Sequence, residues 1–172
     1  MDTATTRRDF LKAVGLLTVM GSASLAGCTT QANEGQPTGP KLPNEPNYKG
    51  FLDGTDNYSH TLDWREKDAI TIEVGSEANM GAYGFSPAAV AISPGTRVTW
   101  EWTGRGGTHN VVATQGTFNS GEPVSEAGTH FEYTFDRPGT YTYVCEPHEA
   151  MGMKGAIFVG LGDPVEDGEA TS

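Results

Sequence analysis

Short segments of alternating apolar and polar residues, separated by turns, restrict the fold of this chain more than any other feature. Three segments alternate with a period of two residues: Ala69–Val74, Arg97–Trp102 and Thr129–Phe135. A period of two places every second side chain on the same face, which is typical of a strand with one buried face. In the third segment that face is aromatic and consists of Phe131, Tyr133 and Phe135.

Further apolar segments of strand length follow the same rhythm: Ala89–Ile92, His109–Val112, Thr140–Val144 and Gly155–Val159. Pro94-Gly95 and Pro138-Gly139 separate some of them, and such pairs mark turns. No helical period longer than a turn or two is present in this region. The pattern therefore predicts an all-β sandwich of about 100 residues with roughly seven to eight strands.

Residues 1–27 have the pattern of an export signal. Arg7-Arg8 is followed by Phe10-Leu11-Lys12 and by a weakly apolar stretch that ends near Ala26. That stretch is too short for a membrane-spanning helix, which needs roughly 20 apolar residues. The pattern resembles a twin-arginine signal peptide, and this resemblance implies export in the folded state. The alternative is an ordinary amphipathic helix with a chance arginine pair.

The end of this segment, Leu25-Ala26-Gly27-Cys28, resembles a lipobox. The resemblance implies cleavage before Cys28 and a lipid on its thiol, which would make the chain a lipoprotein. Two acyl chains hold a protein firmly at a membrane surface, whereas one gives only marginal binding. We therefore expect the protein at the extracytoplasmic face of the cell membrane. The alternative is a cysteine that is discarded with the signal peptide.

The rest of the chain divides by composition into four parts. Residues 28–47 contain a proline at every third position from Pro37 to Pro46, which predicts either an extended tether or a segment without structure. Residues 48–67 form an extension whose weak pattern leaves its packing open. The strands define a domain at residues 68–160, and residues 161–172 form an acidic tail that we expect to be flexible.

The balance of charges limits the possible partners. The chain of 172 residues has 11 Lys and Arg residues against 22 Asp and Glu residues, and its formal net charge is −11. Nucleic acid is not an expected partner, because binding phosphates requires a basic surface. The scarcity of lysine favours adaptation to high salt over docking to a basic partner, since the Debye length falls to about 3 Å at ~1 M salt.

A group of metal-binding residue types lies in the last part of the chain. Cys145, His148 and Met153 have the spacing C-x-x-H-x-x-x-x-M, and His109 begins an earlier predicted strand. The chain has two cysteines, so Cys145 has no disulfide partner once Cys28 is lipidated. Two imidazoles, a thiolate and a weak axial thioether are the ligands of a blue copper site. The spacing therefore predicts one copper ion bound by these four residues.

Each of the four residues also has a simpler explanation. His109 alone fits a histidine at a strand end, Cys145 a small buried apolar side chain, and Met153 core filler. His148 alone fits a surface turn. All four explanations would have to coincide with the spacing of a metal site, which favours the metal. The remaining histidines, His60 and His130, are expected at the surface.

Tyr143–His148 and Gly152–Gly155, with His109–Val112 upstream, resemble the copper motif of the cupredoxin family, within its plastocyanin and halocyanin group. The similarity covers about residues 68–160. It implies a Greek-key β-sandwich in which His109, Cys145 and His148 are equatorial copper ligands and Met153 is axial. It also implies that the backbone region of Asn110 hydrogen-bonds near the thiolate sulfur.

The resemblance further implies a function. The protein would carry single electrons between membrane-bound or peripheral redox proteins by Cu(I)/Cu(II) cycling, with no small-molecule substrate. Electrons would pass through the edge of His148, inside an apolar patch of Pro147, Ala150 and Met151. An enzyme is not expected, because too few histidines remain for a second metal centre. The alternative is an extracytoplasmic copper chaperone or storage protein, although such proteins usually have Met-rich or open sites.

Overall fold

The computed structural model describes residues 36–161. The predicted signal peptide, Cys28, the first part of the predicted tether and the tail after Leu161 lie outside the described residues. Within residues 36–161, no helix combines the length and the apolar character needed to cross a membrane.

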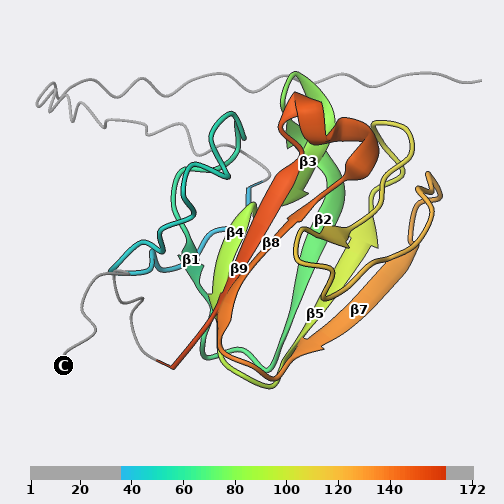
Figure 1. Ribbon diagram of the computed structural model, residues 1–172. Helices are drawn as coiled ribbons and strands as arrows, with labels where there is room; N and C mark the ends of the chain where they lie inside the picture. The colour runs from blue at the N-terminus through green and yellow to red at the C-terminus, as the bar shows by residue number, and fades with distance from the viewer. Residues whose placement is uncertain (1–35, 162–172) are drawn as a thin grey trace, which may run out of the picture. The chain divides into compact units, whose positions relative to one another are not determined.

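The described residues form two β-sheets (Figure 1). The five-stranded sheet has the order β1 (Leu62–Asp63), β4 (Ala89–Ile92), β9 (Lys154–Val159), β8 (Gly139–Val144) and β6 (Val112–Ala113). The four-stranded sheet has the order β3 (Gly81–Ser86), β2 (Ala69–Ala78), β5 (Thr96–Trp102) and β7 (His130–Phe135). Strands far apart in the sequence are parallel neighbours, as β4 is to β9 and β2 is to β5. The all-β Greek-key sandwich predicted from the sequence is confirmed.

The core lies between the inward faces of the strands. In β5 burial alternates along the strand, and Val98, Trp100 and Trp102 are buried. Trp100 is surrounded by rings from other elements, namely Phe118, Phe131, Phe135 and Tyr143. The predicted aromatic face of β7 also contacts this core. Aromatic side chains bury large areas, so the core gives the loops at its end a densely packed support.

Some strands differ from the sequence prediction. The pattern does not predict β3, because it contains two glycines and has no period of two. It does not predict β1 either, which is two residues long. The expected strand His109–Val112 is wrong in its first part. His109 forms an isolated bridge with Val124 instead, and the strand β6 begins only at Val112.

Residues 41–67, here called the N-terminal segment, pack on the five-stranded sheet. Tyr48 and Leu52 form an apolar cluster with Ala89 of β4 and Ala156 of β9. Leu42 is fully buried, although it belongs to the stretch predicted to be a tether. Burial of this apolar side chain anchors the chain before residue 47.

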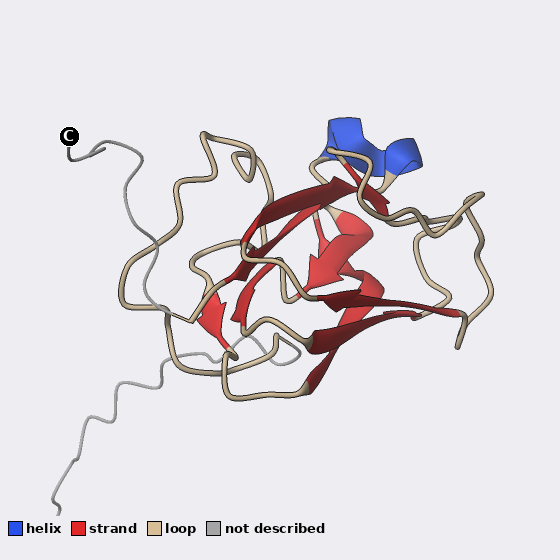
Figure 2. Cartoon of the chain, turned by 60° about the horizontal axis from the view of Figure 1, so that its bottom comes forward, coloured by secondary structure: helices blue, strands red, loops and turns tan. Residues whose placement is uncertain are grey.

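The loops with the predicted metal ligands meet at one end of the sandwich. A short 3-10 helix, η1 (Glu146–Met151), connects β8 to β9 and lies at the top of the molecule in Figure 1. Figure 2 shows this helix in blue at one end of the strands. The β2–β3 hairpin and the loop after β5 reach the same end.

Candidate metal centre

The loop of residues 145–153, here called the ligand loop, contains three of the four predicted ligands. Cys145 follows β8 directly, and Pro147 lies in the first turn of η1, where a missing amide is tolerated. The helix ends at Gly152, whose φ of 92° is in the left-handed region that favours glycine. The amide of Cys145 donates to the carbonyl of Met153, and the amide of Met153 donates to that of His148. These bonds return Met153 to the side of Cys145.

His109 comes from the loop after β5. Its amide and carbonyl both pair with Val124 at 2.9 Å, and the indole of Trp102 donates to its carbonyl at 3.0 Å. The loop approaches the β2–β3 hairpin closely at Gly106, where a Cβ atom would lie 2.2 Å from the carbonyl oxygen of Ala82. The backbone of His109 is therefore held from two sides, and the residue is 1% exposed.

The donor atoms of three predicted ligands converge. Nδ1 of His148 lies 3.1 Å from Nδ1 of His109. Sγ of Cys145 lies 3.5 Å from Nδ1 of His109 and 3.4 Å from Nδ1 of His148. A point equidistant from the three atoms lies about 1.9 Å from each, close to the ~2.0–2.3 Å of metal bonds to imidazole nitrogen and thiolate sulfur. The triangle is thus the right size to hold one metal ion.

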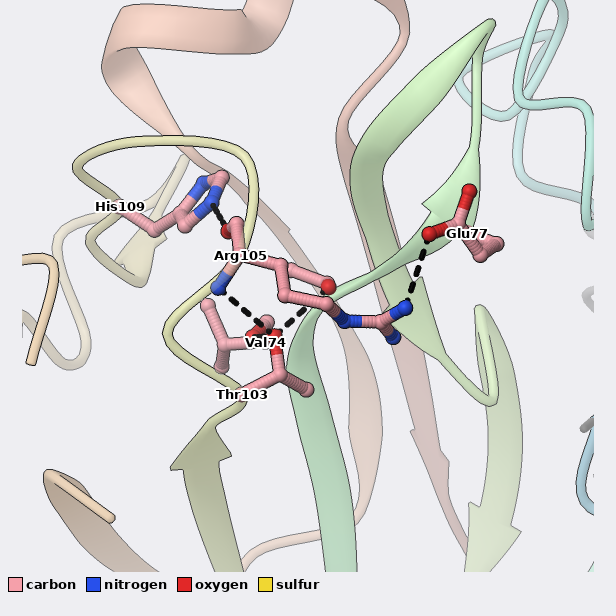
Figure 3. Close-up of polar contacts among 6 residues, drawn as sticks. Val74, Glu77, Thr103, Arg105 and His109 are labelled. Carbon is pink, nitrogen blue, oxygen red and sulfur yellow. Dashed lines mark hydrogen bonds and ion pairs between the residues drawn. The ribbon is translucent and has the colours of Figure 1, made fainter. Parts of the chain in front are cut away.

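The outer nitrogen of His109 determines which nitrogen faces this triangle. Its Nε2 lies 2.7 Å from the carbonyl oxygen of Arg105 (Figure 3). A carbonyl only accepts, so Nε2 carries the proton and Nδ1 presents a lone pair. The carbonyl is held in turn, because the amide of Arg105 donates to Thr103 Oγ1 and the hydroxyl of Thr103 donates to the carbonyl of Gly75. The guanidinium of Arg105 also pairs with Glu77 at 2.8 Å. Such outer contacts orient metal-binding histidines.

Burial governs the protonation of the three side chains. It lowers the pKa of His109. The hydrogen bond to Arg105 raises this pKa, and the nearby His148 lowers it further. Burial also lowers the pKa of His148. Burial raises the pKa of the Cys145 thiol, although hydrogen bonds from the backbone of Asn110 and His148 lower it. Both imidazoles are therefore neutral near pH 7, and a metal ion that binds there displaces the thiol proton.

Asn110 links the loop of His109 to the ligand loop. Its fully buried side chain accepts from the amide of Glu146 at 2.9 Å and donates to the carboxylate of Glu146 at 2.7 Å. Its backbone also lies beside Cys145, where it lowers the pKa of the thiol. Glu146 is not predicted as a site residue, because its partner lies 36 residues earlier and no local pattern marks the pair.

The two methionines of the ligand loop have different environments. Met153 is fully buried in the same core cluster as Cys145. Met151 is 42% exposed, as expected of a residue in the surface patch. The left-handed turn at Gly152 separates the two side chains, so the fold presents Met153 to the interior.

His148 is the half-buried member of the group and lies beside the surface. The ring of Tyr83 packs against it, with 4.7 Å between the ring centroids. The residues predicted to surround it, Pro147, Ala150 and Met151, are exposed. His130 is exposed and His60 is half-buried beside Ser59, and neither belongs to the group of possible metal ligands in residues 36–161.

The donor set fits copper better than other metals. Two imidazole nitrogens and a thiolate sulfur with a nearby thioether are suited to copper, whereas zinc prefers four strong nitrogen, sulfur or oxygen donors. No fourth strong donor from a His, Cys, Asp or Glu side chain joins the group in the described part of the chain.

The sequence is similar to a copper-binding protein family and to proteins named halocyanin and plastocyanin. The model of the family "copper binding proteins, plastocyanin/azurin family" matches residues 70–160. Halocyanin from Natronomonas pharaonis is 46% identical over 96 residues, which cover 54% of this chain and 57% of halocyanin. A plastocyanin from Scenedesmus fuscus is 38% identical over 100 residues, which cover 52% of this chain and 98% of that protein.

Among solved structures, a mutant plastocyanin of fern is 26% identical, with a TM-score of 0.45, and the match covers 53% of this chain and 100% of that one. The match to halocyanin spans little more than half of that protein's length. The family model matches more than half of the present chain and includes all four predicted ligands. The chain therefore belongs to the copper-binding plastocyanin/azurin family, as a halocyanin-like cupredoxin whose cofactor is a single copper ion.

Proposed function

We propose that this protein is a one-electron carrier, not an enzyme, and that His109, Cys145, His148 and Met153 hold its copper ion. The observation that supports this most directly is the convergence of two imidazole nitrogens and one sulfur, 3.1–3.5 Å apart, at the end of a packed sandwich. Copper bound there would supply the couple between Cu(I) and Cu(II).

In this function the protein would hold the copper ligands in fixed positions during oxidation and reduction of the metal. His109 is fixed by the carbonyl of Arg105, and the side chain of Asn110 ties the loop of His109 to Glu146 in the ligand loop. Ligands that are locked by outer contacts move little between the two oxidation states. Small ligand movements keep the activation barrier to electron transfer low.

The side of His148 is the proposed route for the electron. His109 is almost completely buried, whereas His148 is half-buried and is bordered by the exposed Pro147, Ala150 and Met151. A small apolar surface suits short encounters, because weak redox complexes bury little area. We therefore propose that redox proteins dock over His148.

The visible and EPR spectra of the protein loaded with Cu(II) test this function. We expect an intense blue charge-transfer band and a narrow copper hyperfine splitting, both lost in Cys145→Ser with the fold retained. A colourless protein, or one with ordinary tetragonal copper spectra, would contradict the carrier function. Rapid loss of copper to a competing chelator would instead indicate a copper chaperone or storage protein.

We further propose that the mature protein is exported by the twin-arginine route and anchored through Cys28 to the extracytoplasmic face of the membrane. The Arg7-Arg8 pair and the Leu25–Cys28 sequence support this proposal. Fractionation of cells that produce the full chain tests it. We expect the wild type in the membrane fraction, Cys28→Ser released from it, and Arg7→Lys/Arg8→Lys retained inside the cell. A Cys28→Ser protein that stays in the membrane fraction would contradict the lipid anchor.

A further inference from the structure

The N-terminal segment contacts the ligand loop directly, although it precedes the residues that the family model matches. The hydroxyl of Thr55 donates to the carbonyl of Gly152 at 3.1 Å, and Thr55 is 5% exposed. Gly152 immediately precedes Met153. The backbone of Gly54 is also in close contact there, because a Cβ atom on Gly152 would lie 2.2 Å from the Gly54 carbonyl oxygen.

The same turn also contacts the β2–β3 hairpin. The amide of Asp56 donates to Asn79 Oδ1 at 3.0 Å, and Asn79 Nδ2 donates to the carbonyl of Tyr83 at 2.7 Å. Tyr83 is the residue whose ring packs on His148. Residues 54–56 therefore contact the backbone before Met153 directly, and through Asn79 they connect to the backbone of Tyr83, whose ring packs on His148.

The turn is itself well supported. Successive backbone hydrogen bonds shape it, from Asp53 to Gly50, from Thr55 to Leu52 and from Tyr58 to Thr55. Leu52 is buried against the five-stranded sheet. A turn that is anchored to the sheet can transmit this rigidity to the Gly152 end of the ligand loop, whereas Asn110 holds the other end at Glu146.

We propose that Thr55 is a positioning residue of the copper centre, and that the N-terminal segment is a functional part of this centre rather than only a connection. Its hydrogen bond holds the carbonyl of Gly152 and so keeps Met153 directed inward and Met151 directed outward. This inference rests on the proposed function, because it assigns Met153 to the copper ion. The contact itself involves only the protein and is testable without metal.

The test compares three variants. Thr55→Val keeps the shape of the side chain and removes its donor, and Thr55→Ser keeps the donor. Thr61→Val is the matched control, because Thr61 is also buried in the N-terminal segment but bonds to Glu45 and Tyr48. In the metal-free protein, we expect amide hydrogen exchange at Gly152 and Met153 to become about fivefold faster in Thr55→Val, the equivalent of one ordinary hydrogen bond. Thr55→Ser and Thr61→Val should match the wild type there.

With copper, Thr55→Val should also weaken metal binding by about tenfold, as expected when an outer contact of a metal site is lost. Its EPR spectrum and the intensity ratio of its two visible bands should change, and those of Thr55→Ser should not. Unchanged amide exchange and unchanged spectra in Thr55→Val would overturn the proposal. Equal changes in Thr61→Val would also overturn it, because they would show that a general loss of rigidity in the N-terminal segment is responsible. If the wild type itself lacks a blue band, the proposed function fails, and the exchange experiment still decides the contact.

Discussion

Gly152→Ala gives the sharpest test of how the N-terminal segment meets the ligand loop. Two costs arise from the added methyl group. The backbone of Gly152 has a φ of 92°, a conformation that costs an L-residue roughly 1–2 kcal/mol. The new Cβ atom would also lie 2.2 Å from the carbonyl oxygen of Gly54 and 3.1 Å from Asn79 Oδ1. Backbone must move to relieve the first contact, and overpacking of this kind costs about 1–3 kcal/mol.

Gly95→Ala separates the two costs. Gly95 has nearly the same backbone conformation, with a φ of 90°, but a Cβ atom there would have no neighbour within 4 Å. Its variant should lose only the roughly 1–2 kcal/mol of backbone strain. The difference between Gly152→Ala and Gly95→Ala then measures the contacts of the new methyl group, chiefly the one with the Gly54 carbonyl, and we expect about 1–3 kcal/mol.

Urea unfolding of both metal-free variants, followed by tryptophan fluorescence, provides the measurement. The slope of the free energy against urea should be the same in the wild type and both variants, which shows that they unfold from comparable states. Equal destabilisation by the two substitutions would contradict this prediction, because it would mean that the Gly54 carbonyl leaves room for a methyl group on Gly152.

Three other predictions follow from the described contacts. Asn110→Ala should lower the free energy of unfolding by about 2–3 kcal/mol in urea titrations, because two part-buried hydrogen bonds to Glu146 are lost, one of them to a carboxylate. Trp100→Ala should cost about 3–5 kcal/mol in the same assay, since it empties the centre of the aromatic core. The hydrogen bonds from Arg65 lower the pKa of Asp63, so this carboxylate stabilises the fold above its ordinary pKa and stops doing so as the pH falls through the lowered value. The stability advantage over Asp63→Asn should therefore be constant above about pH 5 and disappear in acid, and an advantage that persists in acid would contradict this origin.

The features that can be predicted from the sequence are those encoded within a short stretch of the chain. Strands such as β5 show their period of two within a few residues, because alternate side chains must face one core. Cys145, His148 and Met153 lie within one loop, so their spacing alone indicated a common metal. The acidic composition and the export pattern are likewise properties of the chain itself.

Other parts depend on partners that are distant in sequence. Thr55 and Gly152 are 97 residues apart, and neither belongs to a motif that would mark their contact. The hydrogen bonds between Asn110 and Glu146 join residues 36 positions apart. The weak pattern of the N-terminal segment likewise does not indicate the sheet on which it packs.

Strand period and ligand spacing are local, so the class of the fold, the kind of metal and the side chains available to bind it can be predicted from the amino-acid sequence. How the centre is closed depends on contacts between distant segments. The pairing of Val112 in β6 with Val144 in β8 brings together the loops that carry His109, before β6, and Cys145, after β8. The packing of the N-terminal segment brings Thr55 to the ligand loop. The physical reason is that register and packing are set by the burial of whole sheets, which no single segment of the sequence encodes.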